Sequence, residues 1–255
     1  MPNESNTAIE FVDVGFRLPD GRPLLSDLKL TVQQGETLML LGRSGSGKTT
    51  SLKMINRLLV PTAGEVRVNG ISVMQWDAIR LRRGIGYAIQ DVGLFPHYTV
   101  QENVALVPRL EKWEPGKIAQ RMDEVLTLVG MPSAEFAGRY PHELSGGQRQ
   151  RVGLARALAA EPPILLMDEP FGALDPITRA ELQMEFKKLQ EKLGKTIVFV
   201  THDVGEALLL GSRIALMEGG KLRGVYRPEE FLNAADTATK AYVDVFRAAQ
   251  NMFRN

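Results

Sequence analysis

Gly42-Arg43-Ser44-Gly45-Ser46-Gly47-Lys48-Thr49 is the stretch that decides the fold. It matches the pattern G-x-x-x-x-G-K-[S/T] without a mismatch, and ordinary residue frequencies give such a match in about one chain of this size in a hundred. The apolar run Thr37–Leu41 before it predicts a short buried strand, and apolar residues at helical spacing after Lys48 predict a helix that continues until Pro61. A strand, a glycine-rich turn and a helix together point successive backbone N–H groups at an anion, so the stretch predicts a phosphate-binding loop.

Residues within this loop have separate expected roles. Lys48 reaches the β- and γ-phosphates of a nucleotide, and the Thr49 hydroxyl can ligate Mg²⁺. Gly45 and Gly47 let the backbone approach the phosphates closely. The plainer alternative is a glycine-rich turn with a capping threonine, and the strand before and helix after the loop argue against it.

Two further motifs follow in the second half of the chain. Leu144-Ser145-Gly146-Gly147-Gln148 opens a predicted helix, and its amides with the Ser145 hydroxyl would form an anion site at the positive end of that helix. The apolar run at residues 164–167 ends in Asp168-Glu169, at the edge where open α/β sheets bind ligands. We expect Asp168 to hold Mg²⁺ through water and Glu169 to polarise the attacking water. A serine helix cap and two capping or solvated acids are the plainer alternatives.

The remaining pattern predicts an α/β fold, a P-loop NTPase core with a mainly parallel sheet. Residues 9–16 and 28–32 predict an N-terminal antiparallel β subdomain, residues 91–160 an inserted helical lobe, and residues 213–217 with 222–225 a terminal hairpin. Further strands are predicted at residues 65–70, 85–90 and 196–200, and helical stripes at Met122, Val125, Leu126 and Val129 and at Leu182, Phe186, Leu189 and Leu193. We expect a single domain over residues 1–255, with a core of about residues 1–90 and 161–225, and a short helical tail at 226–255 to which no role is assigned.

Composition narrows the class of protein. The 255 residues carry a net charge of +1, which argues against a nucleic-acid-binding protein, and contain no cysteine, which favours a reducing compartment. The start has no basic segment followed by an apolar run, and no apolar stretch approaches the ~20 residues that span a bilayer. We therefore expect a chain that is soluble by itself, so that any membrane path belongs to another subunit.

These motifs together resemble the nucleotide-binding subunit of an ATP-binding-cassette (ABC) transporter, from Phe11 to about Val225. The resemblance implies an ATPase that binds ATP and Mg²⁺. It implies that the motif Leu144-Ser145-Gly146-Gly147-Gln148, which we call the signature motif, completes the ATP site of the opposite subunit. The chain is therefore expected to form a head-to-tail dimer with two composite sites. The implied nucleotide-binding residues are Phe16, Gly42, Arg43, Ser44, Gly45, Ser46, Gly47, Lys48, Thr49, Thr50, Ser145, Gly146, Gly147, Gln148 and Asp175.

The resemblance also assigns roles to single residues. Glu169 is the base, Gln90 contacts Mg²⁺ and the attacking water, and His202 hydrogen-bonds the γ-phosphate; Thr49, Gln90 and Asp168 are the implied metal site. Phe16 would stack on adenine, with packing in the core as its competitor. Asp175 lies in the loop through which the two sites communicate, whereas His97 and His142 are expected to be surface or packing residues.

Four tracts narrow the resemblance to bacterial importers. Residues 139–145 are similar to importers rather than exporters, and residues 52–58 and 85–97, with 104–108, are similar to the ATPases of osmoprotectant importers for glycine betaine, carnitine or choline. We expect a peripheral protein at the cytoplasmic face of the inner membrane, with transmembrane permease subunits as partners, an extracytoplasmic solute-binding protein as an indirect partner and no nucleic acid. Such subunits often continue into paired regulatory CBS domains; the chain ends where these would begin, so sensing of ionic strength through them is not expected.

The segment 92–100 is the candidate contact for a permease helix. Leu94, Phe95, Pro96 and Tyr98 would offer it an apolar, aromatic surface, and the alternative is that these residues pack inside the lobe.

Other functions stay open at this point. One is an importer for amino acids or another small polar solute, since solute contacts lie on other subunits. Another is an ATPase of DNA maintenance or translation, but no long coiled coil fits between Thr49 and Glu143 and one chain carries one cassette. A regulatory ATP-binding module without turnover is the third, and Glu169 and His202 argue against it.

Overall fold

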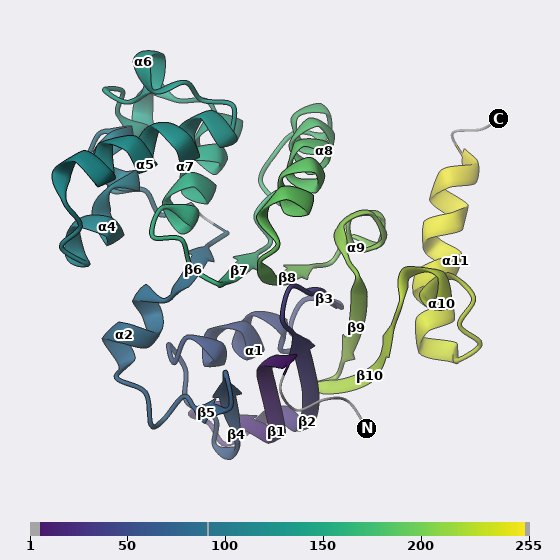
Figure 1. Cartoon of the computed structure of the whole chain (residues 1–255). Coiled ribbons are helices and arrows are strands. Elements are labelled where there is room, and N and C mark those ends of the chain that lie inside the picture. Colours follow the sequence, from purple (N-terminus) through teal and green to yellow (C-terminus); the bar gives the residue numbers. More distant parts are fainter. Residues whose placement is uncertain (1–5, 91, 253–255) are drawn as a thin grey trace. The chain divides into compact units, whose positions relative to one another are not determined.

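The computed structural model of the chain describes residues 6–90 and 92–252 (Figure 1). They form two compact units, one from Met1–Ala78 with Thr196–Asn255 and one from Ile79–Lys195. Asp91, where the predicted helical lobe begins, lies outside the described residues.

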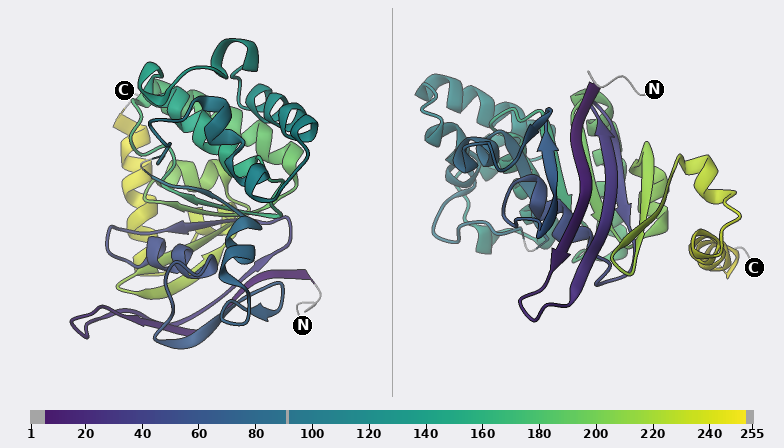
Figure 2. Two further views of the ribbon diagram at one scale, coloured as in Figure 1. Left: turned by 90° about the vertical axis from the view of Figure 1, so that its left-hand side faces the viewer. Right: turned by 90° about the horizontal axis from the view of Figure 1, so that it is seen from below.

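An antiparallel sheet occupies the N-terminal part of the first unit. Its strands are β1 (Thr7–Arg17), β2 (Pro23–Gln33), β4 (Ala63–Val68) and β5 (Ile71–Ser72), in the order β2-β1-β4-β5. The long β1–β2 ribbon is plain in Figure 2. The predicted antiparallel pair is confirmed, although both strands run further than the apolar pattern. Irregular register and left-handed residues at Asp13 and Asp27 interrupt the alternation, so the pattern marked only the regular stretches.

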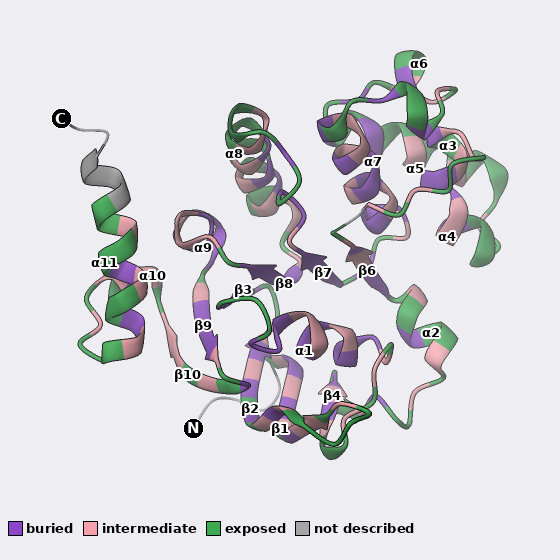
Figure 3. Cartoon of the chain, turned by 180° about the vertical axis from the view of Figure 1, so that it is seen from behind, coloured by how far each residue is buried: buried purple, intermediate pink, exposed green. Residues whose placement is uncertain are grey.

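Parallel pairing surrounds the strand that precedes the phosphate loop. β3 (Thr37–Leu41) pairs in parallel with β8 (Thr196–Thr201) and with β9 (Arg213–Glu218), and β10 (Lys221–Tyr226) runs antiparallel to β9. All residues of β3 and β8 are buried (Figure 3), which explains their unbroken apolar runs. The predicted terminal hairpin is confirmed as β9–β10.

The helix after the phosphate loop is shorter than predicted. α1 (Lys48–Ile55) ends at Asn56, whose side-chain oxygen accepts a hydrogen bond from Leu58 N at 3.3 Å. Arg57 then adopts a φ of 54°, which no helix continues through, and Leu58 is 47% exposed. The apolar spacing up to Pro61 therefore included residues outside the helix.

Three further helices complete the first unit. They are α9 (Val204–Leu210), α10 (Pro228–Leu232) and α11 (Thr237–Met252), and α11 packs against α9 and α10. α10 and α11 lie within the predicted helical tail at residues 226–255, whereas α9 was not predicted.

The second unit combines a strand pair with helices. β6 (Ile85–Ala88) and β7 (Ile164–Asp168) pair in parallel. The helices are α2 (Ala78–Arg83), α3 (Val100–Val104), α4 (Leu106–Leu110), α5 (Pro115–Leu128), α6 (Ser133–Phe136), α7 (Gly146–Leu158) and α8 (Pro176–Leu193), with a 3₁₀ turn at Pro141–Glu143. β6 is shorter than the predicted 85–90, so Gln90 lies in a turn after the strand instead of at its end. The predicted stripes are confirmed, since Val125 and Leu126 of α5 and Leu182, Phe186 and Leu189 of α8 are buried.

In the part of the chain that the structure describes, no helix is both long and apolar enough to cross a membrane.

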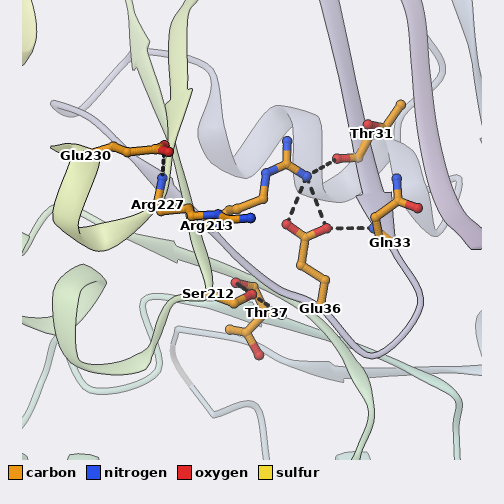
Figure 4. Close-up of polar contacts among 8 residues, drawn as sticks. All are labelled: Thr31, Gln33, Glu36, Thr37, Ser212, Arg213, Arg227 and Glu230. Carbon is orange, nitrogen blue, oxygen red and sulfur yellow. Dashed lines mark hydrogen bonds and ion pairs between the residues drawn. The ribbon is translucent and has the colours of Figure 1, made fainter. Parts of the chain in front are cut away.

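A buried ion pair fixes the start of β3 (Figure 4). The Glu36 side chain is 7% exposed, and Arg213 Nη1 donates to both of its oxygens at 3.0 and 3.2 Å. Glu36 Oε2 also accepts from Gln33 N at 2.7 Å. Ser212 Oγ donates to Thr37 O at 2.9 Å and accepts from Thr37 N at 3.1 Å. The first residues of β3 and β9 are thus tied by side chains as well as by the sheet.

Removing the carboxylate should therefore destabilise the fold. We expect Glu36→Ala to lower the free energy of unfolding by about 2–3 kcal/mol, because it leaves a half-buried guanidinium and a backbone N–H without their acceptor. Glu218→Ala is the matched control; its pair with Arg223 at 3.1 Å is exposed on both sides, and we expect a loss within about 0.5 kcal/mol. Urea unfolding followed by circular dichroism measures the free energy of unfolding of both variants. Equal losses would show that the buried pair stabilises the fold no more than the exposed pair does.

Candidate nucleotide-binding site

The phosphate loop leaves β3 at a point of close backbone contact. Gly42 follows Leu41 directly and is buried, and a Cβ there would overlap the carbonyl oxygen of Met217 in β9. Only glycine lets the chain turn away from the sheet at this position. At the other end of the loop, Gly47 has a φ of 96° and is the residue from which α1 starts.

The interior of the loop is suited to an anion. α1 starts without a side-chain cap at Gly47, and the N-terminus of a helix carries a positive partial charge that favours an anion. Lys48 is 5% exposed, and its Nζ donates to the carbonyls of Gly42 at 2.8 Å and Arg43 at 3.0 Å. The Ser46 hydroxyl is buried without a hydrogen-bond partner, which costs free energy unless a further acceptor or donor meets it. An ammonium, a hydroxyl and a helix N-terminus around one loop fit a phosphate group.

The other predicted residues of the loop are more accessible. Arg43, Ser44 and Gly45 are exposed, and Thr49 and Thr50 are half-buried in the first turn of α1. The hydroxyl of Thr49 is therefore placed where a Mg²⁺ ion bound to phosphate could use it.

His202 lies close to this loop because of the strand register. β3 and β8 are parallel neighbours with Leu41 opposite Thr201, so both chains leave the sheet at the same level. Asp203 N donates to Thr201 Oγ1 at 3.0 Å, and Asp203 Oδ1 accepts from Glu206 N at 3.1 Å as the cap of α9. The turn that carries His202 is thereby held on both sides.

A pocket of ≈ 400 Å³ joins His202 to the phosphate loop. Its lining residues are Arg43, His202, Asp203 and Val204, with Ala241, Tyr242, Val245 and Phe246 from α11. The structure thus brings together two sequence-predicted residues, Arg43 and His202, that are far apart in the chain.

Phe16 lies near the end of β1, opposite Leu25 of β2. It is half-buried, so it is not one of the core aromatic residues that the competing interpretation required. Stacking on adenine stays a prediction.

The second unit holds the predicted acidic residues. Asp168 ends β7 and is 5% exposed, and Tyr87 of the neighbouring strand donates its hydroxyl to Asp168 Oδ2 at 3.5 Å. Burial first, and the Asp168 carboxylate second, raise the pKa of Tyr87, so it stays a hydrogen-bond donor. Sequence reasoning missed Tyr87; the signal was a polar aromatic residue in an otherwise apolar strand, three positions before Gln90. Gln90 itself is exposed, in the turn just beyond β6.

Glu169 has an unusual backbone. Its φ is 44°, although it is not glycine and precedes Pro170, and residues before proline avoid helical conformations. Gly172 N donates to the Glu169 carbonyl at 3.1 Å and closes the turn. Strained residues of this kind concentrate at functional sites, so the observation supports a catalytic role that sequence alone suggested.

The signature motif forms a capped helix start. Ser145 Oγ accepts from Gln148 N at 3.2 Å, and Gln148 Oε1 accepts from Ser145 N at 2.8 Å, a reciprocal capping box at the start of α7. Ser145 and Gly146 are exposed. Gly147 is buried, and a Cβ there would lie 2.8 Å from Thr178 Cγ2 of α8. The helix-cap alternative is therefore realised, and it leaves the serine at an accessible helix N-terminus.

Asp175 caps the next helix. Its Oδ1 accepts hydrogen bonds from Thr178 N at 3.1 Å and Ile177 N at 3.2 Å. These hydrogen bonds, those from Thr178 most of all, lower the pKa of the Asp175 carboxyl. Arg179, one turn further, donates to the carbonyls of Phe171 at 3.2 Å, Gly172 at 3.3 Å and Leu174 at 3.0 Å. Sequence reasoning missed Arg179, because a single arginine on a helix carries no pattern.

The segment after Gln90 ends in what we call the aromatic turn, residues 95–98. Asn103, which is fully buried, holds it: Phe95 N donates to Asn103 Oδ1 at 2.8 Å, and Asn103 Nδ2 donates to the carbonyls of Phe95 at 3.2 Å and Tyr98 at 3.1 Å. Phe95 is 41% exposed, and the rings of Phe95 and Tyr98 lie 5.4 Å apart. Packing inside the lobe is therefore wrong for Phe95. His97 and His142 are exposed, as expected.

A metal ion would need ligands besides protein carboxylates. Among residues 6–90 and 92–252, no group of three or more His, Cys, Asp or Glu side chains could hold one.

Comparison with known proteins agrees with these motifs. The family profile described as "ABC transporter" matches residues 25–172. A choline transport ATP-binding protein of Bacillus subtilis (strain 168) is 51% identical over 232 residues, which are 91% of this chain and 61% of that protein. A glycine betaine uptake system ATP-binding protein of Escherichia coli (strain K12) is 51% identical over 214 residues, 84% of this chain and 69% of that protein. The chain thus spans 61% of the length of the Bacillus relative.

A solved structure gives the same fold. The dimeric, post-hydrolysis state of an ATP-binding cassette bound to ADP and Pi superposes with a TM-score of 0.76 at 36% identity, covering 86% of this chain and 98% of that one. The α/β architecture inferred from the phosphate loop is confirmed by this likeness.

Proposed function

The chain belongs to the ABC transporter family, and from this membership we propose that it binds ATP and hydrolyses it as the energy-supplying subunit of an importer. The observation that carries the proposal is the phosphate loop: a buried Lys48, a helix without a side-chain cap and a buried Ser46 hydroxyl without a partner meet at one turn. The likeness to a cassette solved with ADP and Pi supports it.

Each site residue has a proposed part in the reaction. Lys48 and the loop amides neutralise the charge that grows on the β- and γ-phosphates, and Phe16 stacks on adenine. Glu169 accepts a proton from the attacking water, with Gln90 orienting that water and His202 donating to the γ-phosphate. Thr49 and Asp168 would hold Mg²⁺, with Gln90 at its edge, and the ion would supply charge neutralisation on the phosphate oxygens.

The dimer and domain organisation are proposals of the same kind. We propose two copies arranged head to tail, with Ser145, Gly146, Gly147 and Gln148 of each copy completing the nucleotide site of the other and Asp175 on the loop between the sites. The accessible N-terminus of α7 supports this, because a helix start with exposed residues can accept a phosphate from another molecule. We also keep a single ATPase domain, with a core of residues 1–90 and 161–225, a lobe of residues 91–160 and a tail.

The transported solute is proposed to be a quaternary amine, such as glycine betaine, carnitine or choline. The relatives named for choline and glycine betaine transport support this assignment. The proposed partners are transmembrane permease subunits at the cytoplasmic face of the inner membrane and, through them, a solute-binding protein. Within the second unit, Phe95 borders a groove of ≈ 350 Å³ lined also by Arg82, Arg83, Leu106 and Val107. We propose that the groove and the aromatic turn receive a permease helix.

The first prediction separates binding from water activation. Lys48→Ala should abolish hydrolysis and weaken ATP binding, because the buried ammonium is lost. Glu169→Gln should keep ATP affinity, lower turnover by roughly 10²-fold or more, and trap an ATP-bound dimer, since only proton acceptance is removed. Measurements of the ATPase rate test water activation, and size-exclusion chromatography with and without ATP tests the trapped dimer. Glu181→Gln, on the exposed face of α8, is the control. A Glu169→Gln protein that turns over at the wild-type rate would rule out Glu169 as the base.

The second prediction concerns the composite site. Ser145→Arg should place bulk and charge where the γ-phosphate bound to the other copy lies. ATP binding to the monomer should persist while turnover collapses. His142→Arg, an exposed substitution beside the motif, should leave turnover unchanged. An equal loss of ATP affinity in the monomeric Ser145→Arg protein would contradict a site shared between copies.

The third prediction concerns the membrane partner. Phe95→Asp and Tyr98→Asp should abolish stimulation of ATPase by a glycine betaine- or choline-loaded binding protein in the reconstituted complex, while basal ATPase stays nearly unchanged. Leu110→Asp, at a similarly exposed apolar residue of α4, is the control and should keep the stimulation. Stimulation by an amino acid but by neither amine would retain the importer and refute the proposed solute.

A further inference from the structure

Val92 and Gly93, separated from the aromatic turn by Leu94, have a conformation that valine seldom adopts. Their φ values are 54° and 55°. Glycine takes this left-handed conformation freely, but for a β-branched residue it is a genuine outlier that persists only where surrounding contacts enforce it. The segment links Gln90, a proposed site residue, to the aromatic turn, a proposed partner surface.

The enforcing contacts come from α7. Arg156 Nη2 donates to the carbonyl of Val92 and Nη1 to that of Gly93, both at 2.6 Å. The guanidinium thus holds two successive carbonyls with its planar fork, a geometry that lysine cannot copy. Burial lowers the pKa of Arg156, as expected for a cation held against the protein interior.

A second contact from the same helix acts on the Val92 side chain. Gly153 lies one turn before Arg156, so both residues lie on the same face of α7. A Cβ at Gly153 would come within 2.7 Å of Val92 Cγ1. The side chain of Val92 therefore occupies the space that a larger residue at 153 would fill.

The helix that holds the segment is also the helix that Ser145 caps. α3, which carries Asn103, packs against α7 as well. Asn103 fixes the carbonyls of Phe95 and Tyr98, and Arg156 fixes those of Val92 and Gly93. Consecutive parts of the segment are therefore anchored to one helical body that begins at the signature motif.

We propose that Arg156 and Gly153 form a clamp that holds residues 92–93 in their left-handed conformation and so fixes the aromatic turn to the signature helix α7. In this role Arg156 is a positioning residue: it moves no proton and touches no nucleotide. A displacement of the aromatic turn is carried to the Ser145 end of α7 as long as the clamp is closed. The functional consequence rests on the proposed ATPase function, whereas the clamp itself is a property of the fold and is tested separately.

The first measurement reads the clamp directly. The chain contains no cysteine, so His97→Cys with a nitroxide label gives one probe in the exposed aromatic turn. Arg156→Lys in this background should convert the electron paramagnetic resonance spectrum from mainly immobile to mainly mobile. Gly153→Ala should do the same, even though alanine favours the helix itself, because its methyl group displaces Val92.

Arg151→Lys is the matched control. Arg151 lies on the same helix, donates to the Val129 carbonyl at 2.8 Å and pairs with Glu185 at 2.5 Å, whereas the carbonyls of residues 92 and 93 accept from Arg156. Its spectrum should stay as in the parent protein. An unchanged spectrum for Arg156→Lys or Gly153→Ala, or an equal change for Arg151→Lys, would overturn the clamp.

The second measurement reads its consequence in the reconstituted transporter. Arg156→Lys should lower partner-stimulated ATPase by roughly 2- to 30-fold relative to Arg151→Lys, the range for residues that carry coupling between sites, while KM for ATP stays unchanged. A rise in KM in step with the loss of rate would instead place Arg156 in nucleotide binding and overturn its positioning role. If no variant, including the parent, responds to a partner, the proposed function fails, and the label spectra still decide the clamp.

Discussion

The close contact between Gly42 and β9 is the constraint on which the nucleotide-binding side of the fold depends. β3 is buried between β8 and β9, so the chain can leave the sheet only over the carbonyl of Met217, where a side chain would overlap. The loop then curves back on itself, and its own carbonyls hold the ammonium of Lys48. In the proposed ATPase the loop would thus present a cation that is held in place before phosphate binds, which is the preorganisation that electrostatic catalysis requires.

Local patterns predicted the parts of the fold that local physics determines. The unbroken apolar run of β3, the start of α7 at the Ser145 motif and the glycine pair between β9 and β10 each depend on a few neighbouring residues, and each was predicted correctly. The end of α1 was predicted wrongly. The apolar spacing continued through Leu58, whereas Asn56 and the left-handed Arg57 ended the helix. Spacing reports which residues prefer burial, and it does not report where backbone hydrogen bonds stop.

Contacts between distant parts of the chain could not be predicted in this way. Tyr87 and Asp168 are 81 residues apart, and they meet because β6 and β7 pair in parallel register. Arg156 and Gly93 are 63 residues apart and meet because α7 passes beside the segment after Gln90. The motifs located the residues that are proposed to take part in the reaction, whereas the arginines that hold the neighbouring backbone belong to no motif, since any helix surface can carry an arginine.

In the second unit, arginine side chains donate hydrogen bonds to backbone carbonyls that lie outside helices and strands. The segments that carry its proposed site and partner residues are irregular, so their carbonyl groups lack the partners that a helix or strand would supply. Arg179 supplies them for the loop before Asp175, Arg151 for the end of α5, and Arg156 for residues 92–93. In a helix or sheet, many backbone hydrogen bonds must break together before a segment can move. A loop held by a single arginine side chain can be released when that one side chain lets go, without disturbing the rest of the fold. In the proposed importer ATPase, loops held in this way would have a defined resting position and could still move separately, as a link between nucleotide chemistry and a partner protein requires.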